Sequence, residues 1–255
     1  MVKKLFFFVL GVLIASLFCR VLLCDRFKVK GYSMEPTLHD ADWLWVEKWT
    51  LGGRIYTRYD FSSGSLSCFR FPGFGILVPG DILVFNVPNL DSLGKIKFKM
   101  NHVYAKRCVG APGDIIEINN GYYYNKSVPD SPICPLARQR ILSGLSNDVM
   151  DSLKMDWNNL LGTEWTIKNF GPMKVPGKGD TLVIDSVAVS VYSSVVEYEI
   201  GRFPEIGEKY VFDSNWYFMG GDNVLNSYDS RFFGFVPEDF IIGRAIHKEV
   251  LIDKE

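Results

Sequence analysis

The sequence has few residues of the kinds that bind metal ions. Its 255 residues include five cysteines and three histidines, with no Cys-x-x-Cys pair and no cluster of histidines. Metal sites draw several such ligands from closely spaced positions, so we predict no metal ion and no cofactor. A disulfide between Cys68 and Cys134 is possible in an oxidising compartment, and the odd number of cysteines leaves at least one thiol outside any intramolecular pair.

The sequence also lacks an excess of basic residues. Its 28 Lys and Arg residues are balanced by 29 Asp and Glu residues, for a formal net charge of −1. Because nucleic acids are bound by concentrated positive charge, we predict no nucleic-acid partner. The aromatic content is high, at 15%, and the recurring short runs of β-branched and aromatic residues favour strands.

A single long apolar run stands near the N-terminus. It covers residues 5–24, after a tail at 1–4, and contains one charge, Arg20. Twenty helical residues span about 30 Å, the thickness of a bilayer core. We predict a permanent anchor rather than a cleaved signal peptide, because no small residues precede a cut, or a lipoprotein signal, because the bulky Leu23 precedes Cys24. Basic residues on both sides of the run leave its orientation open.

Most of the remaining patterns indicate strands. Polar and apolar residues alternate at 42–47, and turns with Pro-Gly precede apolar runs at 82–85, 115–118 and 181–184. One helical stretch is predicted at 135–162, where apolar residues recur at intervals of three and four. These patterns predict a mainly β fold with an antiparallel sheet.

Ser33 lies nine positions after the apolar run, so any chemistry it performs takes place at a membrane surface. A nucleophilic serine needs a proton acceptor, and nothing around His102 marks a catalytic triad. Lys106 lies in the strand-like run 103–110, where it can point inward while Arg107 points to water. A lysine acts as a base only if burial lowers its free pKa of about 10.4, by about 2 units. A solvated surface charge is the alternative.

Four sequence segments follow the apolar run in a fixed order. They are GYSMEPTL at 31–38, GDILVF at 80–85, KRCVGAPGD at 106–114 and GDNVLNSYDSR at 221–231. Together they resemble type I signal peptidases, the membrane-anchored Ser-Lys endopeptidases that remove signal peptides from exported proteins. Further matching segments stand at 234–238 and 242–245, while the middle of the chain is poorly covered.

The resemblance implies roles for the residues of the site. Ser33 is the nucleophile, and Lys106 is the general base, first for Ser33 and then for the deacylating water. Gly31 stands where the family has Ser or Gly, so no side-chain hydroxyl is present there for the oxyanion. The oxyanion donors are then the backbone N–H of Ser33, helped by the Gly31 amide or a water.

The last segment supplies support for the dyad in this resemblance. Ser227 orients the lysine, Asp229 and Arg231 form a buried ion pair, and Asp222 and Asn223 complete the support. Val224 and Leu225 depart from the family, since many members carry an arginine and a polar residue there. We therefore do not carry over a charged contact from that loop.

The substrate implied by the resemblance is a signal peptide with small side chains at positions −1 and −3. It would bind extended, by adding a strand to a sheet edge. The residues implied to form its pockets are Phe27, Met34, Leu38, Tyr104 and Ala105, with plain core packing as the alternative. A second apolar group could rest on the lipid interface, with burial again the alternative: Trp43, Trp45, Trp49, Phe71, Phe74, Ile76 and Leu77.

The prediction is thus a membrane protease with one N-terminal transmembrane helix. An antiparallel β catalytic domain at 25–118 and 216–255 is interrupted by an inserted β-rich lobe at 119–215. Its partners are preproteins carrying signal peptides and the lipid bilayer. By resemblance it is a single-pass protein of the bacterial plasma (inner) membrane, with an extracytoplasmic catalytic domain. The alternatives are a soluble self-cleaving regulator of the SOS repressor type and a catalytically inactive, anchored β scaffold.

Overall fold

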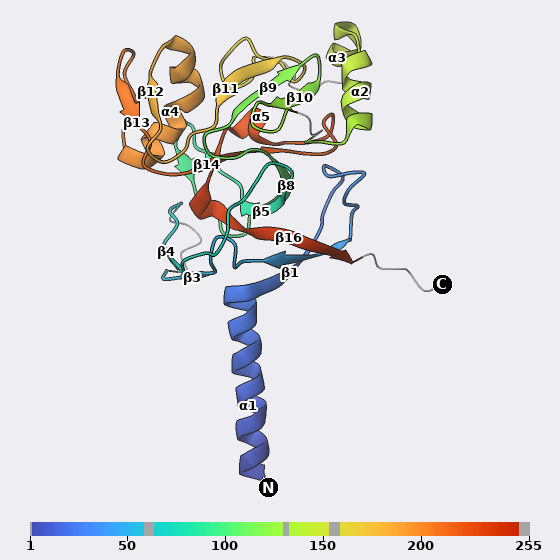
Figure 1. The fold of residues 1–255 in the computed structure, drawn as a ribbon, viewed down its shortest axis with the longest axis vertical. Helices are drawn as coiled ribbons and strands as arrows, with labels where there is room; N and C mark the ends of the chain where they lie inside the picture. The colour runs from blue at the N-terminus through green and yellow to red at the C-terminus, as the bar shows by residue number, and fades with distance from the viewer. Residues whose placement is uncertain (1, 59–63, 130–132, 153–158, 250–255) are drawn as a thin grey trace.

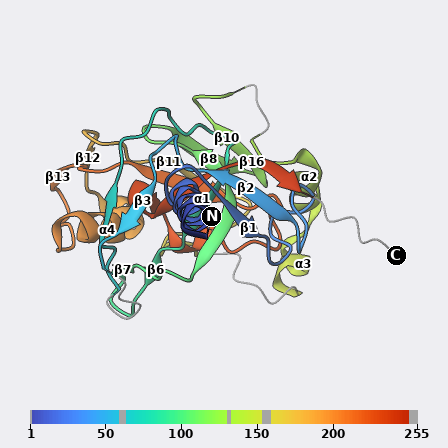
Figure 2. The same ribbon diagram turned by 90° about the horizontal axis from the view of Figure 1, so that it is seen from below.

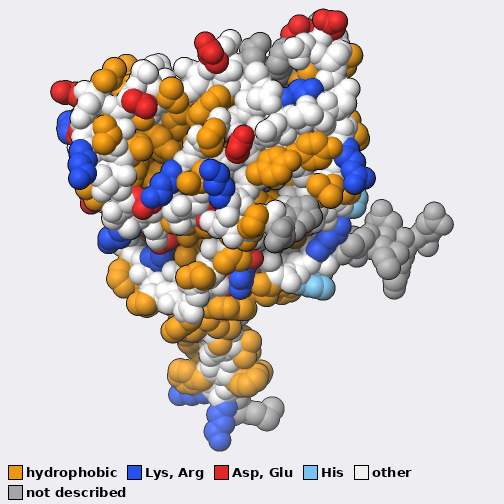
Figure 3. All heavy atoms as spheres, turned by 45° about the horizontal axis from the view of Figure 1, so that its top comes forward, with side chains coloured by type: hydrophobic (Ala, Val, Ile, Leu, Met, Phe, Trp, Pro, Cys, Tyr) orange, Lys and Arg blue, Asp and Glu red, His pale blue; other side chains and the backbone are white. Residues whose placement is uncertain are grey.

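The apolar run forms a helix that stands away from the rest of the molecule (Figure 1). The computed structural model describes residues 2–58, 64–129, 133–152 and 159–249. Helix α1 (Val2–Phe18) continues into a π-helical turn, η1 (Cys19–Leu23), and these 22 residues include an 18-residue window with a mean hydropathy of 2.5, of which no residue is buried. Its length and composition are sufficient to cross a membrane. Figure 3 shows hydrophobic side chains along this helix and basic side chains at its tip.

The end of this helix is held against the body of the molecule. The Lys48 amide donates to the Leu23 carbonyl at 2.8 Å, and Lys48 Nζ donates to the Arg20 carbonyl at 2.5 Å. Gly53 lies so close that a Cβ there would be 2.6 Å from Leu22 Cα. Seen from below, α1 emerges near the centre of the lower face (Figure 2). The segment that connects the helix to Ser33 therefore starts from a point that is packed and hydrogen-bonded against the body of the molecule.

The main sheet has seven strands in the order β1-β2-β16-β5-β8-β14-β15, and its neighbouring strands are antiparallel. The strands predicted at 42–47, 82–85 and 103–110 are confirmed. The bounds are β1 Cys24–Lys28, β2 Trp43–Glu47, β5 Ile82–Asn86, β8 Val103–Gly110, β14 Trp216–Gly220, β15 Val236–Pro237 and β16 Ile241–Glu249.

Smaller elements surround this sheet. Two short hairpins are formed by β3 (Arg54–Tyr56) with β4 (Cys68–Arg70) and by β6 (Asn89–Leu90) with β7 (Ile96–Lys97). Between β14 and β16 lie the short helix α5 (Ser230–Phe233) and the 3-10 turn η2 (Glu238–Phe240). The Asp229 side chain caps α5 by accepting from the Arg231 amide.

The middle of the chain packs on the face of the molecule farthest from α1 (Figure 1). Its described residues form a three-stranded sheet, a two-stranded sheet and three helices. The strands are β9 Ile115–Asn119, β10 Tyr122–Asn125, β11 Phe170–Lys174, β12 Thr181–Val183 and β13 Lys209–Val211, and the helices are α2 Leu136–Gly144, α3 Asn147–Ser152 and α4 Ser186–Ile200. The predicted domain boundaries at 118/119 and 215/216 stay a prediction.

The helix predictions need correction in this region. The stretch predicted at 135–162 forms two short helices, α2 and α3, interrupted at Leu145 and Ser146, while 153–158 lie outside the described residues. Helix α4 was not predicted at all. It begins at its N-cap Asp185, which accepts from the Ala188 amide, and ends at Gly201 in the left-handed conformation.

Two hydrophobic clusters form the core. The larger one joins the main sheet to the middle of the chain and includes Phe85, Trp216, Phe218 and Phe240, all fully buried. The smaller cluster lies beneath the loop that carries Ser33, and its buried members are Val29, Met34, Leu38, Leu44, Val46 and Val84. Because this apolar cluster underlies the loop, the loop is packed in place.

Two sequence expectations are settled by burial and covalent state. The possible disulfide between Cys68 and Cys134 does not form, and all five thiols are free. The apolar group considered for the lipid interface is divided: Phe74 and Ile76 are 88% and 77% exposed, while Leu77 is 4% exposed. Trp45, Trp49 and Phe71 are also exposed, and Trp43 is half-buried.

Candidate active site

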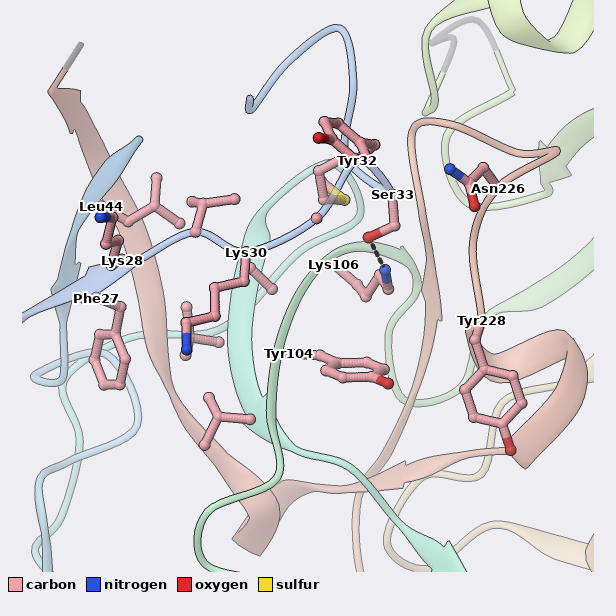
Figure 4. Close-up of a pocket in the computed structure, with 16 residues that line it drawn as sticks. Phe27, Lys28, Lys30, Tyr32, Ser33, Leu44, Tyr104, Lys106, Asn226 and Tyr228 are labelled. Carbon is pink, nitrogen blue, oxygen red and sulfur yellow. Dashed lines mark hydrogen bonds between the residues drawn. The ribbon is translucent and has the colours of Figure 1, made fainter. Parts of the chain in front are cut away.

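Ser33 and Lys106 meet in the folded chain. Ser33 lies on the loop between β1 and β2, which we call the Ser33 loop (29–42), and Lys106 lies in β8. Lys106 Nζ is hydrogen-bonded to Ser33 Oγ (Figure 4). His102 does not line this site, and its Nδ1 lies 3.0 Å from Asn89 Oδ1. This contact would allow a proton to pass from the Ser33 hydroxyl to the Lys106 amine.

Lys106 is almost completely buried, with 2% of the residue exposed. Burial lowers its pKa from 10.5 to about 8; the charges of Asp229 and Asp222 oppose this lowering and that of Arg231 adds to it. Its Nζ also lies 5.3 Å from the centroid of the Tyr104 ring. With a pKa of about 8, about a tenth of the lysines are neutral at pH 7, compared with less than a thousandth for a free lysine. Lys106 can therefore act as a base near neutral pH.

Asn223 holds the backbone of the Ser33 loop. Its amide donates to the Ser33 carbonyl at 3.0 Å, and its Nδ2 donates to the Tyr32 carbonyl at 3.1 Å. Two bonds to successive carbonyls fix the orientation of the peptide that presents Ser33 Oγ. The support predicted for Asn223 thus has a direct geometric basis.

Asp222 connects the same loop to the strand that carries Lys106. Its two carboxylate oxygens accept from Arg107 Nε at 2.7 Å and Arg107 Nη2 at 2.6 Å, and one of them also accepts from Thr37 Oγ1. Arg107 Nη1 donates to the Gly80 carbonyl at 2.7 Å. The prediction that Arg107 points to water is wrong, because a buried carboxylate from the 221–231 segment faces it.

The predicted ion pair between Asp229 and Arg231 is present, and both side chains have no solvent exposure. Arg231 Nε donates to Asp229 Oδ1 at 2.8 Å and Nη2 donates to Oδ2 at 2.9 Å. Burial raises the pKa of Asp229, but the charge and hydrogen bonds of Arg231 outweigh it and hold that pKa below the usual value. Arg231 also donates to the Val224 carbonyl at 2.9 Å, so the pair organises the 221–231 segment.

Ser227 does not make the predicted contact with Lys106. Its Oγ is buried and is not hydrogen-bonded to Lys106. The side chain lies against Gly221, where an added Cβ would be 2.1 Å from Ser227 Oγ. Ser227 therefore packs against Gly221 in this structure and does not hydrogen-bond the lysine.

A cavity of about 510 Å³ opens beside the dyad. Of the predicted pocket residues, Phe27, Met34, Tyr104 and Ala105 line it. Leu38 does not, and that prediction is wrong: its amide donates to the Met34 carbonyl in a turn that directs Leu38 into the smaller core cluster, where it is 2% exposed.

One edge of β8 is open beside this cavity. β5 pairs with β8 from Val103 to Arg107 on one side, whereas β14 pairs only from Arg107 to Gly110 on the other. Among the described strands none pairs with the second edge over 103–106. An extended peptide could add to the sheet there, with its backbone beside both dyad residues.

Comparison with known proteins identifies the family. A family model described as signal peptidase, peptidase S26, matches residues 2–248. The chain belongs to this signal peptidase family. It is a serine peptidase.

Several curated signal peptidases are similar over most of their length. Signal peptidase I of Buchnera aphidicola subsp. Baizongia pistaciae is 27% identical over 92% of this chain and 72% of its own. Signal peptidase I of Rickettsia typhi is 28% identical over 92% of this chain and 75% of its own. A crystal structure of a signal peptidase I from Enterococcus faecalis overlaps with a TM-score of 0.34 at 18% identity, covering 68% of this chain and 100% of that one.

The backbone donors for an oxyanion differ from those expected for this signal peptidase. The Gly31 amide donates to Asp40 Oδ1 at 2.7 Å, so the prediction that it helps to bind the oxyanion is wrong in this arrangement. The Ser33 amide donates to no described residue. Of the two predicted backbone donors, the Ser33 amide is thus the one that forms no hydrogen bond with a described residue.

Sequence reasoning missed several residues that line the cavity. Asn226 and Tyr228 lie in the 221–231 segment and were not given a role, and Lys28, Lys30 and Leu44 were not assigned to the site. Figure 4 shows Tyr228 and Tyr104 facing each other across the region below the dyad. The signal that could have found the lysines is alternation, because Val29 is buried and its neighbours on both sides are exposed.

Gly221→Ala is expected to lower kcat/KM of this signal peptidase about 100-fold or more. A Cβ there would be 2.7 Å from the Ser33 carbonyl oxygen, a backbone atom that cannot rotate away. Misplacing a reacting group by about 1 Å is sufficient for such a loss. Gly144→Ala is the matched control, since a Cβ there meets nothing within 4 Å. Equal activity of the two variants would show that the Ser33 loop can shift to accommodate the added Cβ without displacing Ser33 Oγ.

Proposed function

We propose that this peptidase removes N-terminal signal peptides from preproteins at the extracytoplasmic surface of the bacterial plasma membrane, with Ser33 and Lys106 as its catalytic dyad. The hydrogen bond between a buried Lys106 and Ser33 carries the proposal, because it pairs a nucleophile with a base of lowered pKa. The apolar helix and the signal peptidase relatives support action at a membrane.

The reaction begins with neutral Lys106. Lys106 Nζ takes the proton of Ser33 Oγ as the oxygen attacks the carbonyl carbon of substrate residue −1. The Ser33 amide donates to the oxyanion that forms. The lysine ammonium then gives its proton to the leaving amine, which departs as the N-terminus of the mature protein. An acyl-enzyme remains on Ser33, and Lys106 next takes a proton from the water that hydrolyses it.

The position of the cavity beside the open edge of β8 supports a peptide substrate. A peptide added to the open edge of β8 would place alternate side chains toward Met34, Leu44 and Val84, which line the cavity. We expect small side chains at −1 and −3, because the backbone of such a peptide would lie directly beside the backbone of β8. A signal peptide also carries its own apolar segment, which keeps it in the bilayer that α1 occupies.

Cleavage of a preprotein by the full chain in detergent tests this function. With Ala at −3 and −1 of the preprotein, we expect cleavage directly after residue −1, and no cleavage when −1 is Trp. The Ser33→Ala protein gives the background rate. Intact preprotein after incubation with folded wild-type chain, together with retained peptide binding, would instead indicate the inactive scaffold.

The rate should also report the lowered pKa of Lys106. Because only the neutral lysine accepts a proton, kcat/KM is expected to rise about tenfold per pH unit below pH 8 and to level off above it. The measurement is a pH profile on a substrate without titratable groups near the cleaved bond. A rise that continues to pH 10.5, the ordinary lysine value, would contradict burial of the base.

A further inference from the structure

The cavity beside the dyad carries positive charge that the proposed reaction does not use. Three lysines line it, Lys28, Lys30 and Lys106, and its lining includes no aspartate or glutamate. The Lys106 amine is already hydrogen-bonded to Ser33 Oγ. Lys28 and Lys30 are exposed on the segment that leads to Ser33, and neither forms an ion pair with any described residue.

The carboxylates around the Ser33 loop are already engaged elsewhere. Asp40 accepts from the Gly31 amide at 2.7 Å, and Glu35 lies 3.6 Å from Arg138 Nη2. Asp42 lies 2.9 Å from Lys248 Nζ, and Asp222 lies 2.6 Å from Arg107 Nη2. The chain as a whole has a net charge of −1, so a cavity with lysines alone is a local departure from the average. The two free ammonium groups therefore remain available to a peptide in the cavity.

The position of the lysines shows which part of a peptide they would meet. Residues 27–33 and 103–106 both run toward the dyad, and the end of the cavity at Phe27 belongs to β1, which directly follows the apolar helix (Figure 1). A signal peptide's apolar segment lies in the same bilayer, so the residues before the cleaved bond occupy this end. In Figure 4, Lys30 extends along the cavity toward Phe27.

We propose that Lys28 and Lys30 are specificity-determining residues, which favour signal peptides with a carboxylate at −2 or −4 and disfavour a basic residue there. In an extended peptide these side chains alternate with those of −1 and −3, so they do not compete for the same space. The inference rests on the proposed function, since it names the substrates that the same site prefers.

Peptide binding to the full-length Ser33→Ala chain in neutral detergent tests the preference without turnover. Three peptides differ only in Asp, Asn or Lys at −2, and three more at −4. We expect the Asp peptide to bind about two- to fivefold more tightly than the Asn peptide, and the Lys peptide more weakly, as for partly exposed ion pairs. The difference should shrink as salt is added.

Variants assign the preference to these residues. Lys30→Gln and Lys28→Gln should each reduce the ratio of the affinity for the Asp peptide to that for the Asn peptide. Lys30→Glu should reverse the order of affinities, so that the Lys peptide binds more tightly than the Asp peptide. Lys209→Gln is the matched control, since it removes the same charge from an exposed strand position outside the cavity. A ratio that is unchanged in the cavity variants, or changed equally by Lys209→Gln, overturns the inference.

Two further outcomes distinguish a charge preference for peptides from lipid binding by the lysines and from failure of the proposed function. If Lys28→Gln and Lys30→Gln weaken only the binding of phosphatidylglycerol vesicles and leave the peptide ratio intact, the lysines contact lipid and the inference is wrong. If the wild-type chain cleaves no peptide but the Ser33→Ala ratio behaves as expected, the charge preference stands and the proposed function fails.

Discussion

Lys106→Met is expected to abolish cleavage and, at the same time, to stabilise the fold. Loss of the base should lower kcat about 10⁴-fold or more, as in other hydrolases whose nucleophile loses its partner. The gain in stability comes from burial, because the lysine has a pKa of about 8 when folded and 10.5 as its ordinary value. One pKa unit is worth about 1.4 kcal/mol, so the charged lysine destabilises the fold by about 3 kcal/mol below pH 8.

The lowered pKa of Lys106 also predicts how the free energy of unfolding changes with pH. Since the folded pKa of Lys106 lies below the unfolded one, the unfolded chain binds more protons between about pH 8 and 10.5. The contribution of Lys106 to the free energy of unfolding therefore increases with pH through this window. In the Lys106→Met variant that contribution is absent, because methionine has no charge and fills a similar space.

Unfolding in urea at pH 7 and pH 10, in the same detergent, measures the difference between Lys106→Met and wild type. We expect a large difference at pH 7 and a smaller one at pH 10. Lys95→Met is the control, because Lys95 Nζ lies 2.6 Å from Glu197 Oε1, and the hydrogen bond and charge of Glu197 raise the pKa of Lys95. The charged form of Lys95 is therefore favoured in the folded chain, and its loss should bring no gain in stability. A Lys106→Met protein less stable than wild type at pH 7 would refute the burial argument.

The proximity of Ser33 and Lys106 could be anticipated only from the resemblance of four ordered segments to type I signal peptidases, because the local pattern around Lys106 left a solvated surface charge as the alternative. Ser33 lies in a turn that follows the apolar run, and Lys106 lies in a strand with inward alternation. Arg107 was assigned to water by the same alternation rule. That rule assumes one wet face, whereas Arg107 lies on a strand with neighbours on both sides and faces Asp222, which is distant in sequence. Side-chain partners of that kind are fixed only by tertiary structure.

Helix α4 shows a second limit of the sequence patterns. Val187, Val189 and Val191 alternate with other residues, which is the period of a strand, and β-branched residues favour strands. The helix forms because one side of it is buried against the core, including Val191, Val195 and Val196. Its caps, Asp185 and Gly201, were the local signal that could have identified it. Packing outweighs propensity here, as is common for single helices.

The ion pair between Asp229 and Arg231 is expected to be the most sensitive support of the site. Arg231→Met should lower the free energy of unfolding by about 3–5 kcal/mol, because it leaves a buried carboxylate without its partner. The melting temperature should fall by roughly 10 °C. Cleavage should fall as well, since Asp229 accepts from the Gly221 amide, and Gly221 lies against the Ser33 carbonyl.

The dependence on pH distinguishes a stranded charge from lost packing. In the wild type, Arg231 holds the pKa of Asp229 below its usual value, so this carboxylate stabilises the fold above its unfolded pKa, and the contribution is lost as the pH falls through the folded pKa. Without Arg231, burial raises that pKa instead, and the variant should become more stable as the pH is lowered from 7 toward 5. Lost packing alone predicts no such gain.

The Asp229→Asn, Arg231→Met double variant removes both charges and keeps an acceptor for the Gly221 amide, so it should recover much of the stability. Arg202→Met is the control, because Arg202 pairs with Glu208 through two similar bonds at an exposed position, and its loss should leave the melting temperature nearly unchanged. A double variant no more stable than Arg231→Met would mean that shape, and not charge, makes this pair necessary.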